Sequence, residues 1–443
     1  MSTDEEDLEL NDDTTSQIET ITDDGGDTLD TEDLPSPIQT TAPLAENNTR
    51  LQPDPQMLTC SSYDCVPIVA AVHPTPISSL ATTHCYRWVF TGSEDGYIRK
   101  WDFFSSMNGK TSLTQAQRHY FVDSVVYAGV LSSWWENEEV PETNSNESSL
   151  PPIKPFDIKL SPVFSLAVQS EALWALSGCE NGAINLSTVR HEEGKVHHVL
   201  RKHKGPVSVL EIMPNEQSAI SGSWDTSVLE WDLHTGHLVR SYSGHNSQIS
   251  SASCHPNDEH GLLTTSMDGQ CLLWDRRESN FKRLPLPERT PPWCLSACWS
   301  VDGKKIYVGR RNGTVDEYDF REQKWIQSFR MPANSGPVSF VKSMANGKHI
   351  ICASNDNIRL WNTTIESNFT IRPDSEPGFT ANNKKLSSVI PFSILPGHHG
   401  GTISHISIDP TCKYMITTSG NRGWEGNSTN GCLFYDISPL TNS

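Results

Sequence analysis

The chain has 443 residues, of which 35% are hydrophobic, and it carries a formal net charge of -20. This length and composition allow a large buried core, while the lack of any run of 18 apolar residues excludes a membrane-spanning helix. The 11 cysteines are scattered singly without a C-x-x-C pair, which favours reduced thiols in the cytosol or nucleus over a disulfide framework. The sequence also opens without a basic and apolar leader, so we expect the chain not to be secreted.

The first part of the chain is strongly acidic. Residues 1–50 contain 15 acidic side chains and a single basic one, Arg50. Such a segment cannot bury enough apolar surface to fold alone, so we expect a disordered acidic arm over residues 1–55 and a folded domain over 56–443. The arm is either a solubilising tail or a site for a basic protein partner, and it would repel nucleic acid. Its first candidate partner contacts are Asp4, Glu5, Glu6 and Asp7.

A hairpin pattern recurs along the chain after residue 90. The stretch "TGSEDGYIRKWD" (91–102) places a tight turn between two short runs, which is a hairpin signal. Related stretches have as their marker residues Trp101, Ser187, Trp231, Trp274, Tyr318, Trp361 and Tyr435, at successive spacings of 86, 44, 43, 44, 43 and 74. A period near 43 with a Trp-Asp ending is the signature of a WD-repeat blade. The sequence therefore predicts an all-β, seven-bladed β-propeller.

The seventh predicted blade is incomplete. Its marker, Tyr435, lies only eight residues before the end of the sequence, which leaves no room for a fourth strand. Residues 63–73 are apolar and β-branched and precede the first blade. We therefore expect this segment to be the outermost strand of the last blade and to close the ring.

The carboxylates of the repeats raise the question of chemistry, because two carboxylates in one pocket can act as general acid and base. Because the hairpin recurs along the chain, a structural role is favoured instead, in which a turn Asp accepts from a buried His that is held by a hydroxyl and an indole N–H. We predict that this blade network contains Asp95, Trp101, His203, Ser221, Asp225, Trp231, His245, Thr264, Asp268 and Trp274.

Two insertions interrupt the period, and they are the natural places for function on a rigid platform. The larger, about 104–158, is predicted between blades one and two, and the second, about 363–395, between blades six and seven. The aromatic residues of the first either pack against the propeller or dock a partner. The candidate partner contacts outside the arm are Tyr120, Phe121, Trp134, Trp135, Arg310, Arg311, and Trp424 in a widened hairpin of blade seven.

Fragments that resemble enzyme motifs do not meet the full patterns. In "NGKTS" the glycine required five residues before Gly109 is Phe104, so the phosphate-binding loop is absent. The histidine-rich "RHEEGKVHHVLRKH" lacks a His four positions after His191, so alternation on an outer strand explains it better than a zinc site does. We expect no catalytic residues, no metal and no cofactor.

Several stretches resemble a narrower family than WD-repeat proteins in general. They are "RWVFTGSEDGYIRKWDFF", "NGKTSLTQAQRHYFVDSVVYAGVLSSWWENEE", "SPVFSLAVQSEALWALSGCENGAINLSTVRHEEGK", "SGSWDTSVLEWDLHTG" and "HHGGTISHISIDPTCKYMITTSGNRGWEGNSTNGCLFYDI". Together they are similar to the fungal WD-repeat subunit of the SAGA transcriptional coactivator complex, over about residues 60–438 and including both insertions.

The resemblance implies a nuclear, non-enzymatic subunit that binds the TATA-binding protein and regulates its delivery to promoters in RNA polymerase II transcription. It implies one copy of the chain within a hetero-oligomeric complex, with other subunits of that complex as partners and no direct contact with nucleic acid or membrane. The alternative is a generic WD-repeat peptide reader, such as a histone-tail reader or a ubiquitin-ligase substrate receptor, which would show a peptide-sized pocket in the central channel.

Overall fold

The computed structural model describes most of the chain, namely residues 51–140, 159–278, 280–287, 293–355, 357–364, 391–398, 401–420 and 430–441. Residues 1–50 of the predicted acidic arm and Trp424 lie outside the described residues. The helices that the structure describes are all too short or too polar to cross a membrane.

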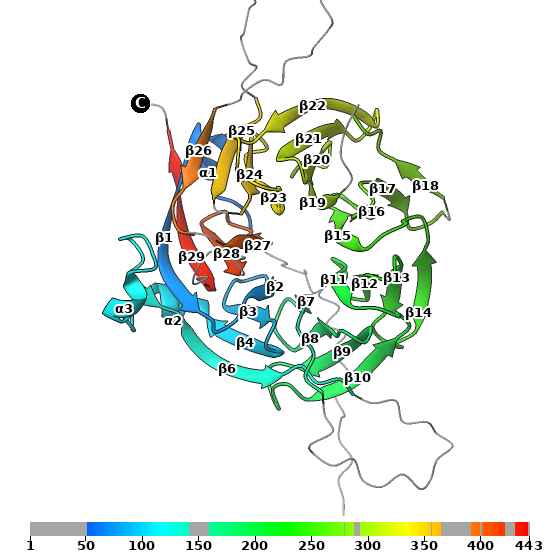
Figure 1. The fold of residues 1–443 in the computed structure, drawn as a ribbon, viewed down its shortest axis with the longest axis horizontal. Coiled ribbons are helices and arrows are strands. Elements are labelled where there is room, and N and C mark those ends of the chain that lie inside the picture. The colour runs from blue at the N-terminus through cyan, green and yellow to red at the C-terminus, as the bar shows by residue number, and fades with distance from the viewer. Residues whose placement is uncertain are drawn as a thin grey trace, which may run out of the picture. The chain divides into compact units, whose positions relative to one another are not determined.

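Seven sheets of mainly antiparallel strands form a ring around a central axis (Figure 1), which confirms the predicted seven-bladed propeller. The inner strands are β2 (Ile77–Thr82), β7 (Leu166–Val168), β11 (Val207–Ile212), β15 (Ile249–His255), β19 (Cys294–Trp299), β23 (Phe340–Ser343) and β27 (Thr402–Ile408). The second strands are β3 (Trp88–Ser93), β8 (Trp174–Gly178), β12 (Ser218–Ser223), β16 (Asp258–Ser266), β20 (Lys305–Arg310), β24 (His349–Ala353) and β28 (Tyr414–Gly420).

The third strands carry the seven marker residues, as the period of the sequence requires. They are β4 (Tyr97–Asp102), β9 (Ala183–Thr188), β13 (Val228–Asp232), β17 (Cys271–Asp275), β21 (Thr314–Asp319), β25 (Ile358–Asn362) and β29 (Gly431–Leu440). The fourth strands are β6 (Val130–Glu136), β10 (Val196–Arg201), β14 (Leu238–Tyr242), β18 (Phe281–Arg283), β22 (Lys324–Arg330), β26 (Phe392–Leu395) and, in the last blade, β1 (Ser62–Val72).

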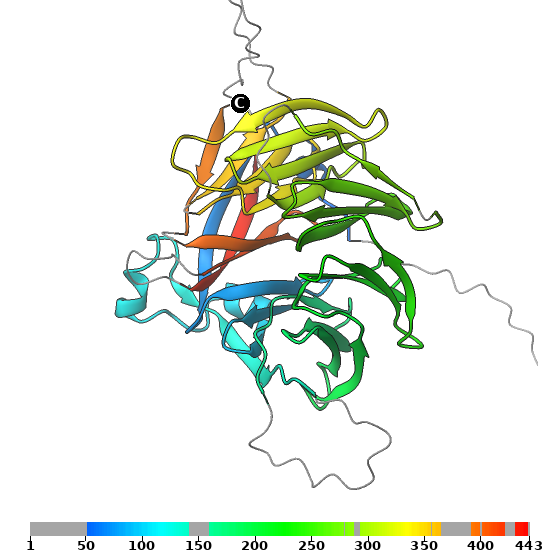
Figure 2. The same ribbon diagram turned by 45° about the vertical axis from the view of Figure 1, so that its right-hand side comes forward.

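The closing strand comes from the beginning of the folded part, as predicted. β1 pairs antiparallel with β29 from Ser62↔Leu440 to Val72↔Gly431, and Figure 2 shows the two strands running side by side. The register shifts after Pro67, where a bulge accommodates a residue that has no N–H for the ladder. The prediction needs one correction, because β1 is the fourth strand but not the outermost: β5 (Tyr127–Ala128) pairs with it in parallel on its other edge.

The turn between the second and third strands needs a residue in the left-handed region of backbone space. A glycine supplies it in most blades, for example Gly96 (φ 81°) and Gly269 (φ 85°). Blade three places Thr226 there with φ 74°, although a β-branched residue is strained in this region. The left-handed backbone conformation of this turn is therefore imposed by the strands of the blade, and it does not require glycine.

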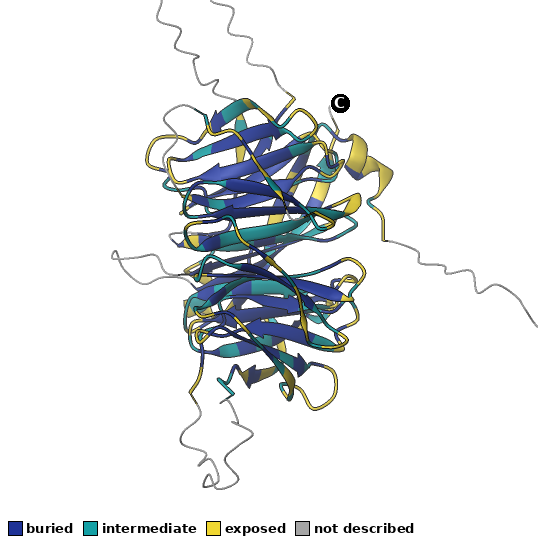
Figure 3. Cartoon of the chain, turned by 90° about the vertical axis from the view of Figure 1, so that its right-hand side faces the viewer, coloured by how far each residue is buried: buried dark blue, intermediate teal, exposed yellow. Residues whose placement is uncertain are grey.

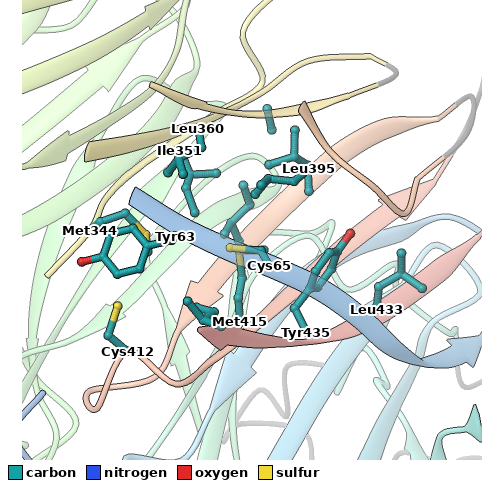
Figure 4. Close-up of a cluster of buried hydrophobic side chains, with 14 of the residues drawn as sticks. Tyr63, Cys65, Met344, Ile351, Leu360, Leu395, Cys412, Met415, Leu433 and Tyr435 are labelled. Carbon is teal, nitrogen blue, oxygen red and sulfur yellow. The ribbon is translucent and has the colours of Figure 1, made fainter. Parts of the chain in front are cut away.

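The core lies between neighbouring blades, so the strands are buried and the connecting loops are exposed (Figure 3). Figure 4 shows the cluster between blades six and seven, where Tyr63 and Cys65 of β1 pack among side chains from both blades. Burying a Leu- or Ile-sized side chain contributes about 1.5–3 kcal/mol. β1 therefore closes the ring through apolar packing as well as through backbone pairing.

The structure corrects the predicted places of both insertions. β6 lies inside the predicted 104–158 insertion and pairs with β4 as the fourth strand of blade one. β26 likewise lies within the predicted 363–395 insertion and pairs with β25. Each insertion therefore begins between the third and fourth strands of a blade and not between two blades.

The first part of the larger insertion, residues 103–129, contains α2 (Phe103–Met107), α3 (Gln115–Arg118) and β5. The remaining helix of the described chain, α1 (Pro55–Thr59), precedes β1 and buries Met57.

Candidate interaction surfaces

The predicted blade network is a closed hydrogen-bond system in blade three. In blade three the His203 ring lies 2.7 Å from the Ser221 hydroxyl through Nε2 and 3.2 Å from the Asp225 carboxylate through Nδ1, and the Trp231 indole N–H donates to the same hydroxyl at 2.8 Å. Burial lowers the pKa of His203, and Asp225 opposes that shift only in part. These groups are satisfied by one another, so they stabilise the blade and leave nothing poised for chemistry.

Blade four repeats the arrangement, but its turn aspartate lies farther from the histidine. The Thr264 hydroxyl lies 2.8 Å from Nε2 of His245 and accepts from the Trp274 indole N–H at 2.8 Å. The Asp268 carboxylate is 3.7 Å from Nδ1 of His245, beyond hydrogen-bond distance, and accepts instead from the backbone N–H groups of Asn246 and Gln270. Asp268 therefore acts mainly as the turn residue in this blade.

Blade one has a different acid partner. Asp95 forms a bidentate-type pair with the Arg99 guanidinium, with the closest N–O distance 2.6 Å, and not with a histidine. Partial burial alone would raise the pKa of Asp95, but hydrogen bonds from Arg99 and Ser93 hold it below its usual value. Trp101 donates to Thr91, whose hydroxyl lies 2.8 Å from His73 at the end of the closing strand. The network prediction omitted His73, although it is the last residue of the predicted closing strand 63–73 and takes the place of the histidine in other blades.

The segment 103–129 packs on the side of the propeller near blades one and seven. Phe103 is fully buried among Tyr86, Tyr414 and Phe434, with ring centroids 5.0–5.5 Å apart. Phe121 is partly buried against the cluster of Figure 4, whereas Tyr120 is 50% exposed. Of the two aromatic candidates in this segment, only Tyr120 is exposed.

Trp134 and Trp135 point to opposite faces of β6, because successive residues of a strand alternate. Trp135 is 7% exposed and packs against Phe90 in the core. The prediction that it contacts a partner is therefore wrong, because it is a core residue. Trp134 is 58% exposed and lies 5.5 Å from the Tyr97 ring in an edge-to-face arrangement. The Tyr97 hydroxyl donates to Glu136, so an exposed indole, a phenol and a carboxylate form one patch, called here the Trp134 surface (Tyr97, Trp134 and Glu136).

Arg310 and Arg311 likewise have separate environments. Arg310 is fully buried and donates to Asp316 at 2.9 Å, to the Gly269 carbonyl at 2.6 Å and to the Tyr318 hydroxyl at 3.1 Å. It therefore links blades four and five and cannot meet an acidic partner, which corrects its candidacy. Arg311 is exposed, with its guanidinium 3.9 Å from the centroid of the half-exposed Trp293, a residue that sequence reasoning missed.

The inner strands enclose a central cavity of about 370 Å³. Many of its lining residues are serines, and its charged lining residues are Glu211 and Lys342. Burial raises the pKa of Glu211, while a backbone N–H from Cys254 and the charge of Lys342 oppose the shift. The cavity is at the small end of the range for ligand pockets, and no second carboxylate lines it. Within the described residues, no group of three or more His, Cys, Asp or Glu side chains is arranged to hold a metal ion.

The candidates Trp424, Asp4, Glu5, Glu6 and Asp7 lie outside the described residues. Of the candidates that the structure describes, Tyr120, Trp134 and Arg311 are exposed, Phe121 is partly buried, and Trp135 and Arg310 are buried. Tyr120 and Trp134 belong to blade one and its insertion, whereas Arg311 follows β20 in blade five.

The seven sheets, the closing strand and the His, hydroxyl and Trp networks define a WD-repeat β-propeller. The family model described as the SPT8 beta propeller matches residues 63–260 and 255–438. The chain therefore belongs to the SPT8 β-propeller family.

Two relatives are similar over most of their length. "SAGA complex subunit SPT8" of Saccharomyces cerevisiae is 36% identical over 85% of this chain and 73% of that protein. "SAGA complex subunit Spt8" of Schizosaccharomyces pombe is 37% identical over 86% of this chain and 80% of that protein. The similarity to a guanine nucleotide-binding protein subunit beta-1 of Nicotiana tabacum is lower, 26% over 46% of this chain.

Proposed function

We propose that the chain is a non-catalytic scaffold subunit of a SAGA-type coactivator complex in the nucleus, where it binds the TATA-binding protein and regulates its delivery to promoters. The observation that carries the proposal is the family membership, since the match covers the propeller from the closing strand through the last blade. The two relatives that cover most of the chain are both named as SAGA complex subunits. Other subunits of such a complex are the further partners that we propose.

Charge supports the contact with the TATA-binding protein. That protein grips the minor groove of DNA with a basic face that also carries apolar side chains. Residues 1–50 of this chain hold 15 acidic and one basic residue, with Leu and Ile among them. An acidic segment of this kind can attract such a face and occupy it in place of DNA.

The Trp134 surface supports a second contact on the propeller itself. An exposed indole beside a phenol is a strong anchor for a partner, because aromatic side chains contribute much contact area at low entropy cost. The Glu136 carboxylate, held by the Tyr97 hydroxyl at 3.1 Å, adds a negative charge at the edge of the patch. An aromatic patch with an acidic edge fits a basic and apolar partner.

The test is a titration of the purified chain with purified TATA-binding protein at about 50 mM and about 200 mM salt, because screening weakens exposed charge pairs. The full chain, a version lacking residues 2–55, and the variant Trp134→Ala are compared. We expect the deletion to remove most of the salt dependence. Trp134→Ala should weaken binding about 30-fold, the fold-change for a hot spot of about 2 kcal/mol.

The matched control is Ile326→Ala, which removes an exposed apolar side chain from β22, the fourth strand of blade five. Binding by the control should equal that of the unmodified chain. Unchanged affinity after deletion of residues 2–55 would reject the arm as a contact, and unchanged affinity of Trp134→Ala would reject the Trp134 surface. If the full chain does not bind at either salt concentration, direct binding of the TATA-binding protein is wrong.

A further inference from the structure

A groove runs along β10, between the outer rims of blades two and three. One wall is the continuous segment His198–Lys202, and the other is the turn and strand start Thr235–Leu238. A second hollow of about 270 Å³ shares His198, Leu200, Thr235 and Gly236 with the first, whose volume is about 360 Å³. Figure 1 shows β10 and β14 at the outer rim of neighbouring blades. We call this feature the β10 groove.

The floor of the β10 groove is apolar. Leu200 and Trp231 belong to the core cluster between the two blades, and the half-buried Leu186 and Leu233 pack against that cluster. The rim is exposed at Leu238. Aliphatic side chains of a ligand would therefore be removed from water on this floor.

The rim of the groove is basic. Its lining contains the cation Lys202 and the imidazoles of His198, His234 and His237. Arg201 also lines it, but its guanidinium donates to the Val140 carbonyl at 2.6 Å. Neither hollow is lined by a carboxylate, and Asp232 in the adjoining turn accepts from the backbone N–H of His234. Lys202 is exposed. In a chain of net charge -20, the Lys202 ammonium and the N–H groups of three imidazoles favour a negatively charged ligand here.

The shape of the groove depends on one close approach. The His198 ring lies over Gly236, where a Cβ would come within 2.3 Å of Nε2. Gly236 also has φ 71°, so glycine is favoured there by both its conformation and its size. This contact fixes one imidazole at the middle of the groove, between its two walls.

β10 also offers a backbone edge. In the sheet of blade two it pairs with β9 on one side, and within the described chain no strand pairs with its other side. Blade seven shows that a fifth strand can be added at this position of a blade, because β5 pairs with the outer edge of β1. An extended peptide can use such an edge for main-chain hydrogen bonds.

We propose that the β10 groove binds an extended acidic peptide segment of a neighbouring protein, with alternate Leu- or Val-type side chains on the apolar floor and carboxylates at Lys202 and the imidazoles. The alternation follows from strand geometry, in which every second side chain faces the same way. This surface is separate from the Trp134 surface, so its test does not depend on the function proposed above.

The test uses a labelled eight-residue peptide of alternating Glu and Val, and a matched peptide with Lys in place of Glu, with fluorescence anisotropy as the measurement. We expect the acidic peptide to bind with a Kd of about 10–100 µM at about 50 mM salt and the basic one to bind at least tenfold more weakly. Hydrogen exchange of the full chain should slow in β10 when the acidic peptide is present.

The variant His198→Glu with Lys202→Glu should lower the affinity for the acidic peptide at least tenfold. Both side chains are exposed, so the variant is expected to fold, and its melting temperature checks this. Lys348→Glu, an exposed lysine of blade six, is the matched charge control and should leave the affinity unchanged. No binding of the acidic peptide up to about 1 mM, equal binding of the basic peptide, or full binding by the double variant would overturn the proposal.

Discussion

Replacing Arg310 tests whether its buried ion pair with Asp316 stabilises the fold. The guanidinium and its partner Asp316 are both buried, 2.9 Å apart, and the arginine also holds the Gly269 carbonyl and the Tyr318 hydroxyl. Arg310→Leu would leave the Asp316 carboxylate buried without its cation. Breaking a buried pair in this way costs about 3–5 kcal/mol.

The expected change in melting temperature follows from the size of the domain. An unfolding entropy of about 2.1 cal/mol/K per residue over roughly 390 residues gives about 0.8 kcal/mol/K. A loss of about 3–5 kcal/mol therefore lowers the melting temperature by about 4–6 °C. Thermal unfolding followed by circular dichroism or calorimetry measures this shift.

Two further variants test whether the broken Arg310–Asp316 pair causes the lower melting temperature. Arg310→Leu with Asp316→Leu removes both charges, and it should be less destabilised than Arg310→Leu, because no unpaired buried charge remains. Arg311→Leu, at the exposed neighbour, should change the melting temperature by less than about 1 °C. A double variant that is less stable than Arg310→Leu, or a single variant that is as stable as Arg311→Leu, would refute the reasoning.

Three other predictions concern the pH dependence of stability, the adjacent residues Trp134 and Trp135, and the closure of the ring by β1. Burial lowers the pKa of both His73 and His405 to about 4, so both are neutral when folded and bind protons more readily when unfolded. Stability should therefore fall by up to about 3 kcal/mol for each as pH decreases from about 6.5 to 4, and His405→Asn should show a smaller fall in melting temperature over that range than the unmodified chain. Trp135→Ala should cost about 3–5 kcal/mol in denaturant unfolding and Trp134→Ala less than about 1 kcal/mol, and equal costs would contradict the opposite orientations of the two side chains. Removal of residues 1–72 deletes β1 and exposes the edge of β29, so we expect aggregation in light scattering, and a soluble monomer with unchanged melting would argue against closure by this strand.

The parts of the molecule that sequence reasoning predicted correctly are those that repeat. The seven marker residues and the closing strand follow from a fixed spacing, and each blade must bury its faces against the next. The Asp, His, hydroxyl and Trp groups of blades three and four could be named in advance because the same residue types recur at the same offsets. Blade one departs from this pattern, because Asp95 pairs with Arg99, four residues further along the chain, and not with His73.

The errors occur where a single residue position decides the outcome. Trp134 and Trp135 are adjacent and chemically identical, yet only one of them is exposed, because the register of β6 against β4 sets which faces outward. Arg310 and Arg311 differ in the same way at the end of β20. The fourth strands β6 and β26 were missed because each follows a long insertion and no longer lies at the 43-residue period.

The sequence by itself determined the number of blades, the strand that closes them and the family, because these depend on spacing and residue type along the chain. Tertiary structure alone decided which charges and aromatic rings are buried and which form surfaces, and it created the β10 groove from two segments that are about 35 residues apart. The physical reason is that burial is a property of contacts between blades. A pattern along one strand predicts that it alternates, but only its pairing partners fix which side faces water.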